Sequence, residues 1–165
     1  MRSIASVFIL GIILLLASCR ADFETVASTG DLKFSKDTVY LDTVFTNIGS
    51  STYQLKVYNK SKNDINIPII QFEKGLNSKY RMTVDGQQGT AGKIFKDITL
   101  LAKDSLYIFI ETTASIADAN PTDFLYTDKI QFDSGANLQT VELVTLIQDA
   151  FFLYPQRFAD GTTET

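Results

Sequence analysis

"STYQLKVYNKSKNDINIPIIQF" (residues 51–72) contains two apolar alternations separated by a polar turn. In the first alternation, Tyr53, Leu55 and Val57 are each separated by one polar residue. Successive side chains of a β-strand point to opposite faces, so this pattern predicts a strand with one buried face. Residues 59–64 are polar, and alternating isoleucines follow them. The stretch therefore predicts two strands joined by an exposed connector.

The same period of two continues along the chain to residue 148. The expected strands span about residues 32–35, 38–47, 53–59, 65–73, 80–85, 94–101, 105–113, 126–132 and 138–148. Many short strands between polar turns are typical of two packed sheets. We therefore predict an all-β chain, folded as an antiparallel β-sandwich of 7–9 strands, with a closed barrel as the alternative. Lys33, Lys56 and Lys129 are expected on outer faces or edges, where they discourage strand addition.

The N-terminal segment has the order of a secretory signal. Arg2 precedes an apolar run over residues 4–16, and "LASC" (16–19) follows it. The small residues before the sole cysteine resemble a bacterial lipobox. That resemblance implies that residues 1–18 are a cleaved signal peptide and that Cys19 is lipidated on sulfur and becomes the new N-terminus.

Two other interpretations of this segment stay open. One is an uncleaved signal-anchor helix with an incidental cysteine, although the uncharged window has 17 residues and a spanning helix needs about 20. The other is a cleaved signal with a free thiol. Under lipidation, residues 19–30 are predicted to be a lipid-anchored flexible tether. The acidic residues close behind Cys19 resemble the surface-export signals of Bacteroidetes lipoproteins, which implies an outer-membrane location.

Composition excludes several classes of function. The chain has 15 Lys and Arg against 19 Asp and Glu, a net charge of −4, so an acidic surface disfavours nucleic-acid binding. Histidine is absent and cysteine occurs once, which removes the usual nucleophile pairs and zinc sites. We therefore predict no enzymatic activity, no metal and no cofactor. An enzyme that uses two carboxylates is the residual alternative.

Several stretches resemble the immunoglobulin-like domains of the abnormal-spindle/Hydin class. They are residues 51–72, "YRMTVDG" (80–86), "LLAKDSLYIFIETT" (100–113) and "DKIQFDSGANLQTVELVTLIQDA" (128–150). The resemblance implies that the sandwich is immunoglobulin-like and spans residues 31–150, as in the domain found near the N-terminus of Bacteroidetes surface lipoproteins. Longer members of that group carry a further β-rich region. Residues 151–165 are expected to be a disordered linker or tail, and the family supplies no catalytic residues.

Three short motifs match the acceptor pattern for O-glycosylation in Bacteroidetes. In each, Asp precedes a hydroxyl residue and an apolar residue follows it, which makes Thr38, Thr43 and Ser105 the candidate acceptors. Unmodified strand-edge hydroxyls are the alternative. Residues 118–123 faintly resemble a calcium loop, but position six is Asp123 and position twelve is Lys129, so no calcium site is predicted.

Aromatic residues at outward positions are the remaining candidates. Tyr58, Tyr107 and Phe109, and also Tyr40, fall on the polar side of their expected strands. Gathered on one sheet, such rings could bind a sugar or a peptide. The alternative is that they form cross-strand pairs with a purely structural role.

These observations together predict a lipid-anchored, non-catalytic β-sandwich. Its expected role is that of a spacer or protein-interaction module at the bacterial outer membrane, on the periplasmic face or the cell surface. The alternative is a surface lipoprotein that binds a glycan or a peptide. The expected partners are membrane lipid, through Cys19, and a protein or glycan.

Overall fold

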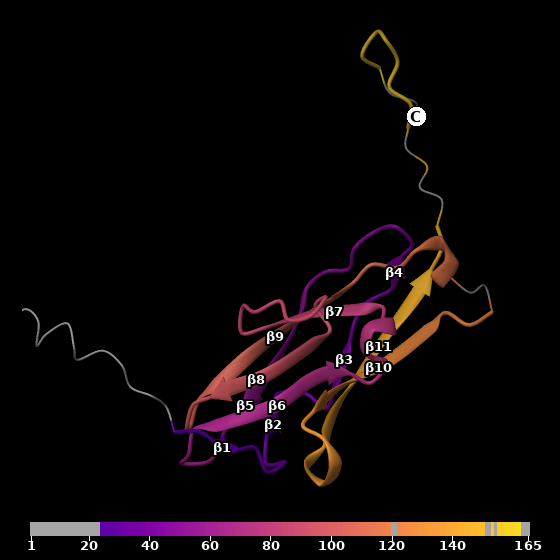
Figure 1. Ribbon diagram of the computed structural model, residues 1–165. Coiled ribbons are helices and arrows are strands. Elements are labelled where there is room, and N and C mark those ends of the chain that lie inside the picture. Colours follow the sequence, from indigo (N-terminus) through magenta and orange to yellow (C-terminus); the bar gives the residue numbers. More distant parts are fainter. Residues whose placement is uncertain (1–23, 120–121, 151–152, 154, 163–165) are drawn as a thin grey trace, which may run out of the picture.

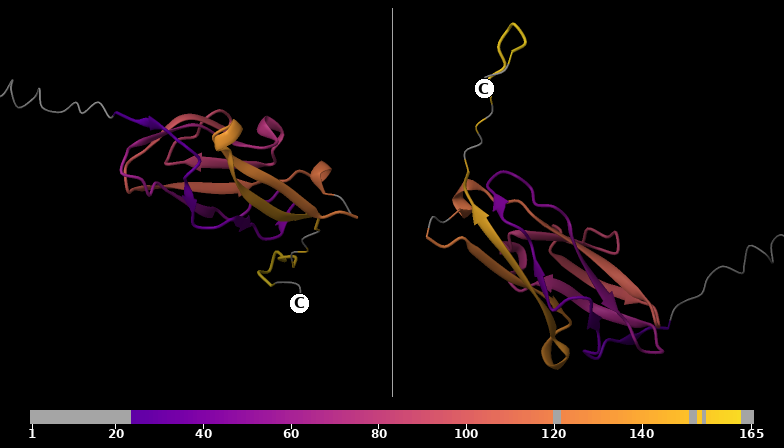
Figure 2. Two further views of the ribbon diagram at one scale, coloured as in Figure 1. Left: turned by 90° about the horizontal axis from the view of Figure 1, so that it is seen from below. Right: turned by 180° about the vertical axis from the view of Figure 1, so that it is seen from behind.

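The computed structural model describes residues 24–119, 122–150, 153 and 155–162, and these residues form two facing β-sheets (Figures 1 and 2). The strands are β1 (Val26–Ala27), β2 (Lys33–Phe34), β3 (Thr38–Tyr40), β4 (Val44–Phe45), β5 (Tyr53–Tyr58), β6 (Ile65–Phe72), β7 (Tyr80–Val84), β8 (Ile94–Leu100), β9 (Ser105–Thr112), β10 (Leu125–Phe132) and β11 (Gln139–Gln148). Short 3₁₀ turns follow β6, β9 and β10: η1 (Gly75–Asn77), η2 (Ile116–Asp118) and η3 (Gly135–Asn137). The predicted immunoglobulin-like sandwich is confirmed, and the closed barrel is wrong, because the strands form two separate sheets.

The seven-stranded sheet is built around β6 and the β10–β11 hairpin. β6 pairs with β8 on one side, and with β1 and β10 on the other. β10 and β11 pair antiparallel from Leu125↔Leu146 to Phe132↔Gln139, and β3 and β4 then lie along the far side of β11. The second sheet has the order β2-β5-β9-β7 and is antiparallel throughout.

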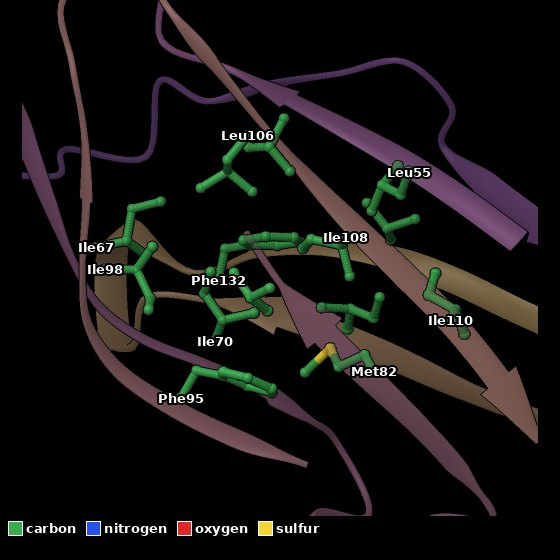
Figure 3. Close-up of a cluster of buried hydrophobic side chains, with 14 of the residues drawn as sticks. Leu55, Ile67, Ile70, Met82, Phe95, Ile98, Leu106, Ile108, Ile110 and Phe132 are labelled. Carbon is green, nitrogen blue, oxygen red and sulfur yellow. The ribbon is translucent and has the colours of Figure 1, made fainter. Parts of the chain in front are cut away.

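The core lies between the inner faces of the two sheets, and Figure 3 shows its centre. The four-stranded sheet contributes Leu55, Ile108 and Ile110, while the seven-stranded sheet contributes Ile70 and Phe132; all are fully buried. Their neighbours within the strands, such as Gln54, Phe109 and Gln131, are partly or fully exposed, as the alternation predicted. Burial of a leucine- or phenylalanine-sized side chain contributes roughly 1.5–3 kcal/mol to folding, so this alternation is the main source of stability.

One of the predicted strands differs in the structure. The strand expected over 38–47 is divided into β3 and β4, because residues 41–43 form a connector between them. Leu41 in that connector is still buried, so the alternation continues through a segment that is not itself a strand. β3 and β4 each pair parallel with β11, and the described residues contain eleven strands rather than 7–9.

Part of the predicted tether belongs to the sandwich. Within residues 24–30, the described part of 19–30, β1 pairs parallel with the start of β6. Ser28 is buried, and its hydroxyl donates a hydrogen bond to the buried carboxylate of Asp133 in the β10–β11 turn. These contacts hold the chain from residue 26 onward against the sheet. The signal peptide, Cys19 and the rest of the tether lie outside the described residues.

Pro68 lies inside β6 without breaking the sheet. Proline has no N–H to donate, so it is normally confined to edges or irregular positions. β1 pairs with β6 before this position and β10 pairs with it after, which leaves Pro68 without a partner on that side. On the β8 side it faces Asp97, whose φ of 53° interrupts regular pairing. The ladder is therefore irregular where the donor is missing.

Two tyrosines join β7, at the edge of the four-stranded sheet, to β10 of the other sheet. The Tyr80 ring of β7 lies 5.2 Å from the Tyr126 ring of β10, and its hydroxyl donates a 3.1 Å hydrogen bond to the Tyr126 carbonyl. The Tyr126 hydroxyl accepts a 2.9 Å bond from the backbone N–H of Lys79. Burial raises the pKa of both phenols, so both stay neutral at physiological pH. The pair closes the sandwich where β7 faces β10.

A pair of phenylalanine variants measures how much the inner face contributes. Phe132→Ala should lower the free energy of unfolding by about 3–5 kcal/mol, because it removes a fully buried ring from the core. Phe109→Ala, the same change at an outward position, should cost at most about 1 kcal/mol. Urea unfolding of both variants checks this, and equal losses would mean that the strand faces are misassigned.

Candidate functional site

Three of the predicted binding aromatics lie together on the outer face of the four-stranded sheet. Burial of Leu106, Ile108 and Ile110 forces the intervening Tyr107 and Phe109 of β9 outward, where they are 39% and 40% exposed. In the antiparallel register, Lys56 of β5 lies opposite Tyr107, and Tyr58 lies two residues further along β5 on the same face. We call the group formed by Lys56, Tyr58, Tyr107 and Phe109 the aromatic face.

Two rings of the aromatic face stack on each other, and lysine ammonium groups lie over its tyrosine rings. The Tyr107 and Phe109 centroids are 6.4 Å apart and their planes differ by 19°. Nζ of Lys56 lies 4.9 Å from the Tyr107 centroid and 5.2 Å from that of Tyr58, and Nζ of Lys60 lies 4.6 Å from the Tyr58 centroid. Such contacts hold a cation over a ring by roughly 0.5–1 kcal/mol at exposed sites. Interaction with the Tyr107 hydroxyl raises the pKa of Lys56, so the ammonium group is charged at neutral pH.

A hollow lies on each side of the aromatic face. One, of about 410 Å³, is lined by Ser35, Lys36, Thr52, Tyr53, Gln54, Lys56, Tyr58 and Tyr107. The other, of about 430 Å³, is lined by Arg81, Met82, Thr83, Gln88, Gly89, Ala91, Gly92, Phe109 and Glu111. Both hollows are open and contain polar groups, so the surface suits an extended polar ligand that lies across the strands.

The ionic groups of the second hollow are already paired. Arg81 donates from Nε and Nη2 to Oε2 of Glu111, at 3.1 and 2.8 Å, and from Nη1 to the Thr113 hydroxyl at 2.8 Å. The hydroxyl of Thr52 donates to Oε1 of Glu111 at 2.5 Å. The Thr52 hydrogen bond and then Arg81 lower the pKa of Glu111. This carboxylate is therefore ionised at neutral pH and poorly suited to general acid catalysis.

The other candidate residues are spread over the molecule. Thr38 lies in β3, opposite Glu142, and Thr43 is exposed in the connector between β3 and β4. Ser105 begins β9 opposite Tyr58, partly buried beside the aromatic face. Tyr40, 70% exposed, is on β3 in the seven-stranded sheet and so does not join the aromatic face.

Asp118 serves a structural role in the described part of the faint calcium motif. Oδ1 of Asp118 pairs with Nζ of Lys79 at 2.7 Å, and Oδ2 accepts 2.8 Å hydrogen bonds from the backbone N–H and hydroxyl of Ser115. The hydrogen bond from Lys79, and then that from the Ser115 backbone, lower the pKa of Asp118 to about 2. Within the described ranges, no three acidic or cysteine side chains come together as metal ligands.

Lys60 was not among the residues expected at the site. Lys60 belongs to residues 59–64, which predict an exposed connector. The sequence nevertheless indicates its position, because Lys56, Tyr58 and Lys60 stand at every second residue. If the alternation of β5 continues by one step, Lys60 falls on the same face as Tyr58.

No protein-family model matches the chain, and no curated protein matches it. Among solved structures, it is similar to the E. coli chaperone DraB (16% identity, 74% of this chain, 57% of the chaperone, TM-score 0.45). It is also similar to a family 123 glycoside hydrolase from Clostridium perfringens (9%, 73% of this chain, 27% of the hydrolase, TM-score 0.47).

A third solved structure, PapD-like domain 7 of human CEP192, is described as an ASH / PapD-like domain (11% identity, 80% of this chain, 94% of that domain, TM-score 0.44). The chain thus spans little more than half of the chaperone and about a quarter of the hydrolase. With identities and TM-scores this low, none of the three assigns an activity or a partner to this chain.

The role of Asp118 predicts a pH-dependent contribution to stability. Its pKa is lowered on folding, so the stabilisation is present above the ordinary value of 3.8 and is lost as pH falls through about 2. Asp118→Asn should therefore be less stable than the wild type by about 1 kcal/mol at pH 7, with the difference closing below about pH 3. Unfolding free energies from pH 2 to 7 check this. A constant difference across that range would contradict the ionic role.

Proposed function

We propose that this chain is a lipid-anchored, non-catalytic β-sandwich that acts as a spacer or protein-interaction module at the bacterial outer membrane. The observation that carries the interaction role is the aromatic face, which lies exposed between two hollows. Exposed aromatic clusters with polar rims are typical of interaction sites, because the rings bury a large apolar area on binding and lose little conformational entropy. The orientation, periplasmic or cell-surface, is left open by this proposal.

The anchor is proposed from the sequence. A thioether to diacylglycerol would use the sole thiol of the chain, at Cys19. Each buried methylene contributes roughly 0.8 kcal/mol, so two or three acyl chains would make release very slow. Among the described residues, none forms a helix long and apolar enough to cross a membrane.

The positions of the chain ends support a spacer role. The start of β1 and the end of β11 lie at opposite ends of the sandwich (Figures 1 and 2). A lipid-anchored tether that joins the sandwich at the β1 end would therefore hold the end of β11 a full domain length away from the membrane.

O-glycosylation is proposed at the three Asp-hydroxyl-apolar motifs. Thr43, exposed between β3 and β4, is the best placed of the three proposed acceptors, because Thr38 and Ser105 are partly buried.

Binding of a glycan or a peptide by the aromatic face is the second candidate function. The hydrogen bonds at the β7 edge favour a ligand that lies across the face of the sheet over a peptide that pairs with this edge as an added strand. The outward N–H groups of β7, on Met82 and Val84, donate to the carbonyls of Gly92 and Gln87 at 2.8 and 3.0 Å. A peptide that added a strand there would have to displace these bonds.

The anchor has a direct test in the native host. Cys19→Ser should move the protein from the membrane fraction to the aqueous fraction, since serine cannot form the thioether. Intact mass of the wild type should equal residues 19–165 plus the acyl groups. An unmodified thiol or an uncut leader in the wild type, or membrane retention of Cys19→Ser, would refute the anchor.

The interaction role is tested by site-specific photo-crosslinking on intact cells. A benzophenone amino acid at position 107 should give a cross-linked product, because this side chain lies at the centre of the aromatic face. The matched control is the same amino acid at position 40, an exposed tyrosine on the opposite sheet. No product from position 107, or equal products from both positions, would argue against an interaction through this face.

A further inference from the structure

Lysines gather around one end of the aromatic face. Lys56 and Lys60 lie against its rings, and Lys33 of β2 is paired with Tyr58 across the strands. Phe34 packs inward, 4.8 Å from the Phe132 ring, so its neighbour Lys33 points outward. Lys36 lines the adjoining hollow. These four lysines belong to a chain of net charge −4, so the positive charge here is local.

These lysines are not neutralised within the described part of the chain. The ion pairs found there involve Lys79, Arg81 and Lys129 instead. Asp104, before β9, is the carboxylate whose charge bears on Lys56, and it accepts a 2.7 Å hydrogen bond from the N–H of Ser105. The acidic Glu111 lies at the far end of the face and is held by Arg81. The face thus has a positive end and a neutralised end.

We propose that the aromatic face binds an acidic polysaccharide, one whose sugar rings carry carboxylate groups. Tyr107 and Phe109 stack near-parallel with each other and together present exposed aromatic surface against which a sugar ring can pack. Lys56 lies over Tyr107, Lys60 lies over Tyr58 and Lys36 lines the adjoining hollow, so their ammonium groups can pair with the carboxylates. The hydroxyl of Ser35 and the amide of Gln54 border the same hollow and can hydrogen-bond to sugar hydroxyls.

A glycan fits this surface better than an acidic peptide. Extended peptides bind sheets mainly through backbone hydrogen bonds at a free edge. The β7 edge is occupied by its own loop, and at the opposite edge Ser35 is hydrogen-bonded to both backbone groups of Lys56. The backbone groups in the middle of the face are bonded within the β5–β9 and β7–β9 ladders. Only side chains are left to recognise a ligand there, and they are rings, ammonium groups, hydroxyls and amides.

The inference rests on the second candidate function, and its test uses the full-length chain in detergent micelles. Titration calorimetry with polygalacturonic acid should show binding, and neutral β-1,4-galactan should bind at least ten-fold more weakly because it lacks the carboxylates. Poly-L-glutamate offers the same charge without sugar rings and should also bind at least ten-fold more weakly. Absence of binding to polygalacturonic acid, or equal affinity for either comparator, would overturn the proposal.

Variants separate stacking from charge. Tyr107→Ala should weaken binding about ten-fold, and Lys56→Gln roughly three-fold. Lys96→Gln, an exposed lysine on β8 of the other sheet, is the matched control and should bind as the wild type does. Phe109→Ala gives a second probe of stacking if Tyr107→Ala does not fold, as judged by its urea midpoint. Unchanged affinity in a folded Tyr107→Ala or Phe109→Ala would overturn the proposal.

The outcomes also separate this inference from the proposed function. If polygalacturonic acid does not bind but position 107 still gives a cross-linked product, the acidic-glycan inference alone is wrong. If position 107 gives no cross-linked product, the interaction role is wrong. If Cys19→Ser stays in the membrane fraction, the lipid anchor is wrong.

Discussion

Contact between the inner faces of the two sheets governs the rest of this molecule. Because side chains alternate along a strand, burial of Leu106, Ile108 and Ile110 leaves Tyr107 and Phe109 no position except the outer surface. The aromatic face is thus a geometric consequence of the core. A shift of one residue in the register of β9 would exchange the two sets, bury the tyrosine hydroxyl and expose the isoleucines.

The periphery of the sandwich is held by a small number of polar contacts between distant segments. The Ser28 hydroxyl and the Asp133 carboxylate join the start of the described chain to the β10–β11 turn. Tyr80 and Tyr126 join the two sheets where β7 faces β10. Buried polar groups are costly unless paired, so these contacts specify where the ends of the strands must meet more than they add stability.

Charge is unevenly distributed over the outer surfaces. Among the described residues, Glu111, Asp118 and Glu142 each form an ion pair with a basic partner. The lysines beside Tyr58 and Tyr107 lie against aromatic rings instead. Cation–π contact keeps an ammonium group charged and partly exposed, and so leaves it able to meet a further anion. This difference gives one end of the aromatic face its chemical character.

The sequence by itself determined the strand class, most strand positions and the direction in which each side chain points, because alternation is a local property of neighbouring residues. It also contained the reason that Tyr58, Tyr107 and Phe109 point outward. Tertiary structure decided which strands are neighbours. Parallel pairing of β1 with β6, and of β3 and β4 with β11, depends on contacts between residues far apart in the chain, which no local pattern encodes. Strand pairing also decided that Tyr40 lies on the opposite sheet and that Lys56 lies beside Tyr107. The alternation along each strand therefore predicted that the rings are exposed, but only the fold brought the rings and the lysines together.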